Sequence, residues 1–178
     1  MQSQVHVFLE GWDTFYVIAG SVAGALIGLQ FVVIALVADS SRRATAPEIA
    51  AFGTPNVLHF CAALLVSALV SIPWHSLAGF LLAVAACGIG GLSYVAVVIR
   101  RARSTTAYRP ELEDWVWHAV LPFIAYLSLL VAVAFLGRYA PSGMGFIAGA
   151  TLGLVFIGIH NAWDTITYIA TGPDHGVK

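Results

Sequence analysis

Long apolar stretches, separated by short polar or charged segments, fill most of the chain. Each stretch is about 20 residues long, which is the length that an α-helix needs to cross roughly 30 Å of hydrocarbon. The pattern predicts an all-α fold, a polytopic membrane protein that forms a single membrane domain over residues 1–178. Its five transmembrane helices are expected at about 15–38, 56–72, 76–99, 117–136 and 143–163.

Prolines and short polar segments set the expected helix boundaries. Residues 47–54 resemble a short amphipathic piece on the membrane surface, and Pro55 is a good first-turn residue for the second helix. The turn at 73–75 is so short that the second and third helices should form a tight antiparallel hairpin. Pro122 should bend the first turns of the fourth helix, because its ring removes a backbone donor.

The basic residues fall on alternate sides of these five helices. Seven of the eight Lys and Arg residues lie on one side of the predicted membrane, and Arg138 lies on the other. Cytoplasmic segments carry an excess of Lys and Arg, so the N-terminus should be outside and the C-terminus in the cytoplasm. The residues on the cytoplasmic side are Arg42, Arg43, Arg100, Arg101, Arg103, Arg109 and Lys178.

The composition agrees with a membrane location. Apolar residues make up 60% of the chain and charged residues 10%, with a mean hydropathy of +0.88. Soluble domains carry about 25% charged residues, so this chain could not cover its apolar surface in water. A formal charge of −1 excludes nucleic acid as an expected partner, and membrane lipid is the partner that the composition predicts.

The first, third and fifth predicted helices share a pattern of small residues spaced four apart. Such spacing aligns small side chains on one helix face and allows two helix backbones to approach closely. We weigh two interpretations, tight packing inside one chain and a subunit interface around a pore, and the second predicts a homo-oligomer. The helix-packing residues are Gly20, Gly24, Gly28, Ala83, Cys87, Gly91, Gly145, Gly149 and Gly153.

The first helix resembles that of a broad group of uncharacterised bacterial multi-pass membrane proteins. The resemblance rests on Phe15-Tyr16, the Gly-rich stretch to Gly28, and Gly28-Leu29-Gln30-Phe31-Val32, which follows the pattern Gly-Leu-x-Phe-Val. It implies a bacterial inner (cytoplasmic) membrane and no particular activity.

Polar side chains from several predicted helices gather near the cytoplasmic side. Polar groups inside a span face protein or water, because an unpaired one in hydrocarbon costs several kcal/mol. His160 and Asp164 are four residues apart and share a helix face, as do Asn56 and His59, which are three apart. The candidate pore or polar-cluster residues are Gln30, Asn56, His59, Tyr94, His118, His160, Asn161 and Asp164.

Three interpretations of this cluster remain open. The side chains could cap helix ends and pair with each other or with water. They could line a hydrated vestibule that tunes ion passage or responds to pH. They could also form a metal site, and copper, zinc, iron or haem are the cofactors that imidazole ligands would suit. The tentative metal ligands are His59, His118, His160 and Asp164.

These observations favour a small oligomeric channel or permease with a polar cytoplasmic mouth. Gln30, His59, His160 and Asp164 would line the path, and the glycine faces would set its narrowest part. A membrane-embedded metal- or haem-binding redox protein and an accessory subunit of a membrane complex are the alternatives. The chain has no dinucleotide-binding, P-loop or Gly-x-Ser-x-Gly motif that would indicate an enzyme.

Overall fold

The structure of the chain, a computed structural model, describes residues 11–39, 46–104, 112–136 and 140–171. Its side chains are described over 11–36, 56–103, 112–136 and 142–167. Within these ranges all regular structure is helical, as the hydropathy pattern predicts. The elements are α2 (Asp13–Asp39), α3 (Ala46–Ser71), α4 (Leu77–Ser104), α5 (Leu112–Trp115), the π-helical turn η1 (Val116–Val120), α6 (Leu121–Leu136) and α7 (Ala140–Thr171).

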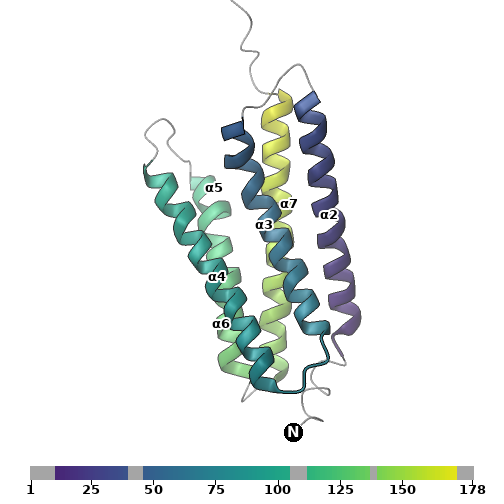
Figure 1. Ribbon diagram of the computed structural model, residues 1–178. Helices are drawn as coiled ribbons and strands as arrows, with labels where there is room; N and C mark the ends of the chain where they lie inside the picture. Colours follow the sequence, from purple (N-terminus) through teal and green to yellow (C-terminus); the bar gives the residue numbers. More distant parts are fainter. Residues whose placement is uncertain (1–10, 40–45, 105–111, 137–139, 172–178) are drawn as a thin grey trace, which may run out of the picture.

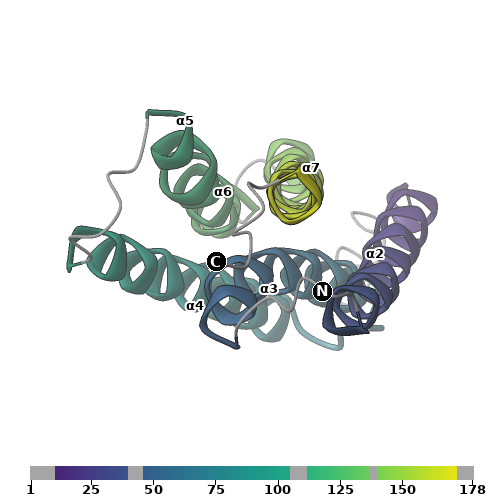
Figure 2. The same cartoon turned by 90° about the horizontal axis from the view of Figure 1, so that it is seen from above.

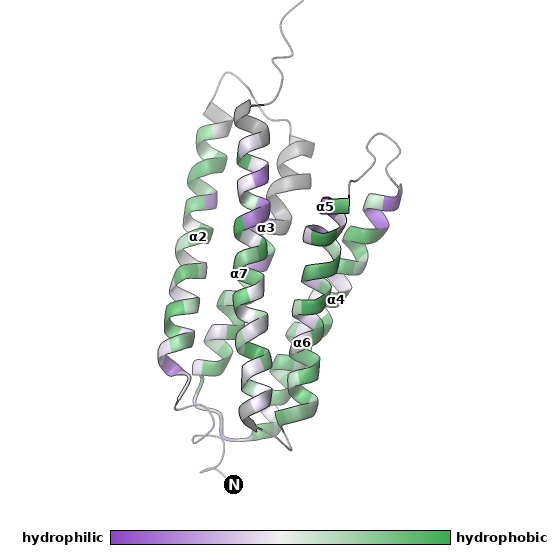
Figure 3. Cartoon of the chain, turned by 180° about the vertical axis from the view of Figure 1, so that it is seen from behind, coloured by the Kyte–Doolittle hydropathy of each residue, from purple (hydrophilic) through white to green (hydrophobic). Residues whose placement is uncertain are grey.

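Four of these helices are long and apolar enough to cross a membrane. They cover Asp13–Leu36, Leu77–Arg103, Leu112–Leu136 and Ser142–Thr167, and a shorter apolar helix covers Asn56–Ser71. Many large apolar side chains on the outer surface are exposed, including Phe31, Leu82 and Phe156. Figure 3 shows the apolar colour extending over the outer faces of α2, α4 and α6. A soluble domain rarely exposes so large an apolar area, whereas lipid would cover it.

The helices run alternately up and down, and α4, α6, α7, α3 and α2 follow one another as packed neighbours (Figures 1 and 2). We call the end of the bundle that carries Arg100, Arg101 and Arg103 the basic end. The opposite end, where residues 72–76 join α3 to α4, is called the turn end. The loop residues Arg42, Arg43, Arg109 and Arg138 and the terminal Lys178 lie outside the described residues.

The helix α3 starts earlier than the sequence pattern predicts. It begins at Ala46 and continues through Pro55 without a break, so residues 47–54 are its first turns and not a separate surface segment. Pro47 takes the first-turn position that we expected for Pro55, because its missing N–H has no partner to lose there. Inside a helix Pro55 removes one backbone hydrogen bond, and the surrounding turns tolerate that loss.

The α3–α4 connection is short, but the two helices separate beyond it. At the turn, the Trp74 N–H donates to the Ile72 carbonyl at 2.8 Å and the Trp74 indole Nε1–H donates to the Leu69 carbonyl at 2.7 Å. From there α4 packs mainly against α6, and it leans away from α3 toward the basic end (Figure 1). The expected tight hairpin is therefore limited to the turn end.

The fourth span changes helix type just before Pro122. The Leu121 N–H donates to the Val116 carbonyl, five residues earlier, which closes a π-helical turn. Proline has no N–H for the carbonyl four residues before it, so a wider turn at this point accommodates the missing bond. The sequence predicted a local distortion at this position, and the structure shows that the distortion is a π-helical turn.

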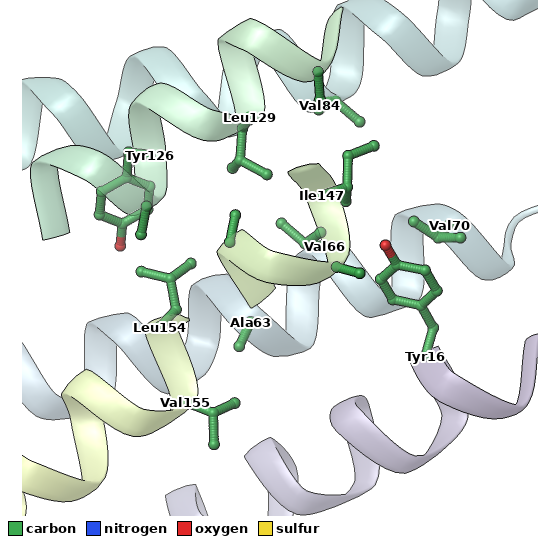
Figure 4. Packing of buried hydrophobic residues seen from close by; sticks show 14 of the residues in the cluster. Tyr16, Ala63, Val66, Val70, Val84, Tyr126, Leu129, Ile147, Leu154 and Val155 are labelled. Atoms are coloured by element: carbon green, nitrogen blue, oxygen red, sulfur yellow. The ribbon is translucent and has the colours of Figure 1, made fainter. Parts of the chain in front are cut away.

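Apolar side chains fill the centre of the bundle toward the turn end. Val66, Leu129, Ile147 and Leu154 are completely buried and come from α3, α6 and α7. Figure 4 shows Val66, Leu129 and Ile147 pointing toward one another. Protein interiors pack as densely as organic crystals, so this part of the bundle is closed to water.

Candidate functional site

The predicted polar residues all lie toward the basic end, but they divide into separate groups that face different neighbours. The His59 group comprises His59, Tyr94 and Tyr126, between α3, α4 and α6. The amide group, on α2, α3 and α7, comprises Gln30, Asn56 and Asn161. The His160 group, on α5, η1 and α7, comprises Glu113, Trp117, His160 and Asp164.

The His59 group is a buried histidine enclosed by two tyrosine rings. Nδ1 of His59 and the Tyr126 hydroxyl share a hydrogen bond of 3.1 Å, and these two residues are 2% and 1% exposed. The Tyr94 ring meets the imidazole edge-on, with 6.3 Å between centroids. A buried imidazole nitrogen without a partner is costly, so the Tyr126 hydroxyl accounts for the orientation of His59.

Tyr126 did not emerge from the sequence, because one tyrosine in a long apolar helix has no local sign of its partner. Its ring lies directly against α4 at Gly91, where a Cβ atom would overlap Cδ1 and Cε1 of the ring. Gly91 is one of the predicted helix-packing residues. Its lack of a side chain gives the Tyr126 ring the space from which its hydroxyl reaches His59.

We expect Tyr126→Phe to lower the free energy of unfolding by about 1–3 kcal/mol, because it leaves Nδ1 of His59 buried without a partner. Tyr94→Phe is the matched control, since the Tyr94 ring contacts the same imidazole but only through ring packing. Thermal unfolding of both variants in the same detergent measures the difference. Equal melting temperatures for the two variants would contradict the proposed hydrogen bond.

The His160 group links α7 to the start of the fourth span. The imidazole of His160 stacks on the Trp117 ring, with 3.6 Å between centroids and 6° between planes. Its Nε2 lies 3.8 Å from Oε1 of Glu113, and its Nδ1 lies 3.3 Å from Oδ2 of Asp164, although that second contact lacks hydrogen-bond geometry. Carboxylate oxygens therefore lie near both ring nitrogens of His160.

This group is partly open to solvent: the side chains of His160, Asp164 and Glu113 are 26%, 53% and 71% exposed. The sequence pattern identified the pairing of His160 with Asp164 from their spacing. Glu113 and Trp117 were not recognised as neighbours of His160, because neither residue is near it in the chain.

Of the four proposed metal ligands, His160 and Asp164 lie side by side, but His59 and His118 have other partners and the four do not form one cluster. Nδ1 of His118 lies 3.2 Å from the Asp114 carbonyl, which occupies that nitrogen, while His59 faces Tyr126 and His160 faces Trp117. Over the described ranges, no three His, Cys, Asp or Glu side chains lie close enough together to hold a metal ion. The residues therefore give no support for copper, zinc, iron or haem.

The amide group is the most deeply buried of the three. Asn56 and Asn161 are each 1% exposed and Gln30 is 8% exposed. Asn56 Nδ2 donates to the Thr165 hydroxyl at 3.4 Å, and that hydroxyl donates to the Asn161 main-chain carbonyl at 2.8 Å. The Asn56 side chain therefore lies against the turn of α7 that runs from Asn161 to Thr165.

Gln30 lies at the same level of the bundle. A Cβ atom on Gly20 of α2 would be 3.0 Å from Cβ of Ser67 on α3, which fixes the register of this antiparallel pair. Both helices rise about 1.5 Å per residue, so Gln30, ten residues beyond Gly20, lies at about the level of Asn56 along the bundle.

The small residues spaced four apart have different surroundings. Gly20 and Gly91 lie against side chains of neighbouring helices, Gly153 is in ordinary contact with Ala125, and Ala83 and Cys87 are half-buried on α4. A Cβ atom on any of the other four would meet no described atom within 4 Å, so these four do not pack closely against another helix within the described ranges. They are Gly24, Gly28, Gly145 and Gly149.

The long apolar helices and the apolar outer surface are those of a helical membrane protein. Comparison with protein families, with curated proteins and with solved structures finds no match for this chain. Its function must therefore be argued from the three polar groups.

Proposed function

We propose that this chain is a small permease of a bacterial inner membrane, with its solute entrance at the basic end. The observation that carries the proposal is the burial of Asn56, His59 and Asn161 in one half of a bundle whose core is mainly apolar. Polar residues inside a membrane span are costly to bury, and ionisable ones such as His59 are common along substrate and ion pathways.

The apolar core at the turn end would close the path in this conformation. Leu129 and Ile147 are buried between α6 and α7 on that side of the polar groups, and a dry apolar constriction stops water and polar solutes. Passage would require α4 and α6 to move away from α3 and α7.

The arginines orient the proposed permease. With Arg100, Arg101 and Arg103 in the cytoplasm, the basic end and its polar groups would open to the cytoplasmic side. The N-terminus would then be outside, because α2 runs from the turn end to the basic end. A tag at the N-terminus that is accessible to a membrane-impermeant reagent in intact cells would agree with this orientation, and an inaccessible tag would contradict it.

Proteoliposomes test the proposal directly. The purified chain should accelerate the flux of at least one small polar solute, measured by light scattering after an osmotic step, relative to protein-free liposomes. His59→Leu should reduce that rate toward the protein-free value. Ser128→Ala is the matched control, since the Ser128 hydroxyl only donates to the Ile124 carbonyl of its own helix. Rates equal to those of protein-free liposomes for every solute would exclude the permease.

A second candidate is an accessory subunit of a larger membrane complex. The faces at Gly28 on α2 and at Gly145 and Gly149 on α7 favour it, because they are exposed and a Cβ atom there would meet no described atom within 4 Å. Close helix contacts in membranes use faces of this kind. Cross-linking of the protein in native membranes would reveal such a partner, and a strictly monomeric chain would exclude it.

A further inference from the structure

The side chain of Asn161 is buried with both of its polar atoms unpaired. Both Oδ1 and Nδ2 of its side chain lack a partner, and the residue is 1% exposed. Oδ1 of the neighbouring Asn56, also 1% exposed, has no partner either. Leaving a buried donor or acceptor unpaired costs about 1–3 kcal/mol each, so a chain gains little from keeping these amides unless something else binds them.

Among the described residues, the group that hydrogen-bonds to the Asn56 side chain is uncharged. It is the Thr165 hydroxyl, and Asp164, next to Thr165 in sequence, directs its carboxylate toward His160. Gln30, at the same level on α2, is a third amide. The amide group therefore offers oxygens and N–H groups to a ligand without a charged partner.

The unpaired atoms restrict the ligand. A bare cation such as Na⁺ would bind the amide oxygens but would be repelled by the N–H groups of Asn161. A chloride ion would accept from the N–H groups but would be repelled by the oxygens. Only a group that both donates and accepts hydrogen bonds satisfies Oδ1 and Nδ2 of Asn161 together. Urea and primary amides carry a donor and an acceptor side by side, and water is the smallest molecule with both.

From this geometry we infer that Asn56 and Asn161 form the binding site of a small neutral solute that donates and accepts hydrogen bonds. The inference rests on the proposed permease, because it names the class of solute that the permease would carry. Asn161 contributes one oxygen and one N–H group to the ligand, and Asn56 contributes its oxygen.

The two asparagines can be observed separately, because they are the only two in the chain. Protein labelled with ¹⁵N-asparagine has two side-chain NH₂ signals, which Asn161→Leu assigns by removing one of them. Acetamide should shift the Asn161 signal, and NaCl or sodium acetate at the same concentration should not. Contacts to water that acetamide does not displace would also support the neutral class, with water as the ligand.

Other results would overturn the inference. A shift with NaCl would assign the site to an ion. Signals unaffected by all three solutes, without contacts to water, would mean that the two amides pair with each other. Binding is read from the NH₂ signals and does not depend on transport. Acetamide binding without flux in liposomes therefore refutes the permease alone. Flux in liposomes, with NH₂ signals that show no binding of a neutral ligand, refutes the neutral site alone.

The variant used for assignment should fold. Leucine has the same branching as asparagine, and it removes two unpaired polar atoms from a buried position, so Asn161→Leu should keep or raise the melting temperature. Thr151→Val is the matched control on the same helix, since Thr151 is equally buried but its hydroxyl donates to the Ile147 carbonyl. It should leave both NH₂ signals and their response to acetamide unchanged.

Discussion

Gly91→Ala should destabilise the protein by about 3 kcal/mol, the upper end of the usual cost of overpacking a core. The new methyl group would overlap Cδ1 and Cε1 of Tyr126, whose ring is 1% exposed. To remove the overlap, α4 must move away from α6 or the ring must leave its site. Either response also disturbs the hydrogen bond between Tyr126 and His59, so solute flux should fall as well.

Gly90→Ala is the control for this prediction. Gly90 is the next residue on the same helix, and a Cβ atom there meets nothing within 4 Å. Alanine is favoured over glycine in a helix by about 0.8–1.0 kcal/mol, so this variant should be slightly more stable than the wild type. Melting temperatures in detergent compare the two variants, and equal values would refute the close packing of α4 on α6.

The second large effect is expected at the α3–α7 contact. In Gly158→Ala, the new Cβ atom would lie 2.5 Å from Cε1 and 2.8 Å from Cζ of Phe60. Phe60 is 1% exposed, so its ring can move only by displacing α3. We expect a loss of about 2 kcal/mol in the free energy of unfolding, within the range for an overpacked core.

Gly149→Ala provides the comparison on α7, since Gly149 is exposed and meets nothing within this chain. It should leave the melting temperature unchanged or slightly raised. A loss as large as that of Gly158→Ala would instead show that another chain covers the Gly149 face. That result would favour the accessory-subunit candidate over a chain that acts alone.

Hydropathy was sufficient to locate most of the helices. The predicted helices at 15–38, 76–99 and 117–136 agree with α2, α4 and α6 within a few residues, because long apolar runs leave few alternatives to a membrane helix. The start of α3 was wrong by ten residues. Either Pro47 or Pro55 could occupy a first turn, and local sequence does not show which one the backbone uses.

The sequence predicted how far each polar residue lies from the membrane face. It did not predict which neighbouring helix each side chain faces. Counting residues from the helix ends placed Asn56 and His59 near one membrane face. It could not show that Asn56 turns toward α7 while His59 turns toward α6, since that depends on which helices are neighbours. Tyr126 was missed for the same reason, because only its contact with Gly91 across two helices reveals it.

The glycines show a similar limit. Gly20 and Gly24 share the same spacing, yet Gly20 lies against α3 and Gly24 meets no atom within 4 Å. Lipid and a neighbouring helix are equally apolar, so hydropathy cannot distinguish a glycine that faces one from a glycine that faces the other. The way α2 crosses α3 determines which of these glycines faces another helix.

The most direct test of the account compares flux through Asn161→Leu and Thr151→Val in proteoliposomes of equal protein content. Urea entry, followed by light scattering, reports whether the amide group lies on the solute path. The account predicts that Asn161→Leu falls to the rate of protein-free liposomes while Thr151→Val keeps the wild-type rate. Urea flux through Asn161→Leu at the wild-type rate would contradict it.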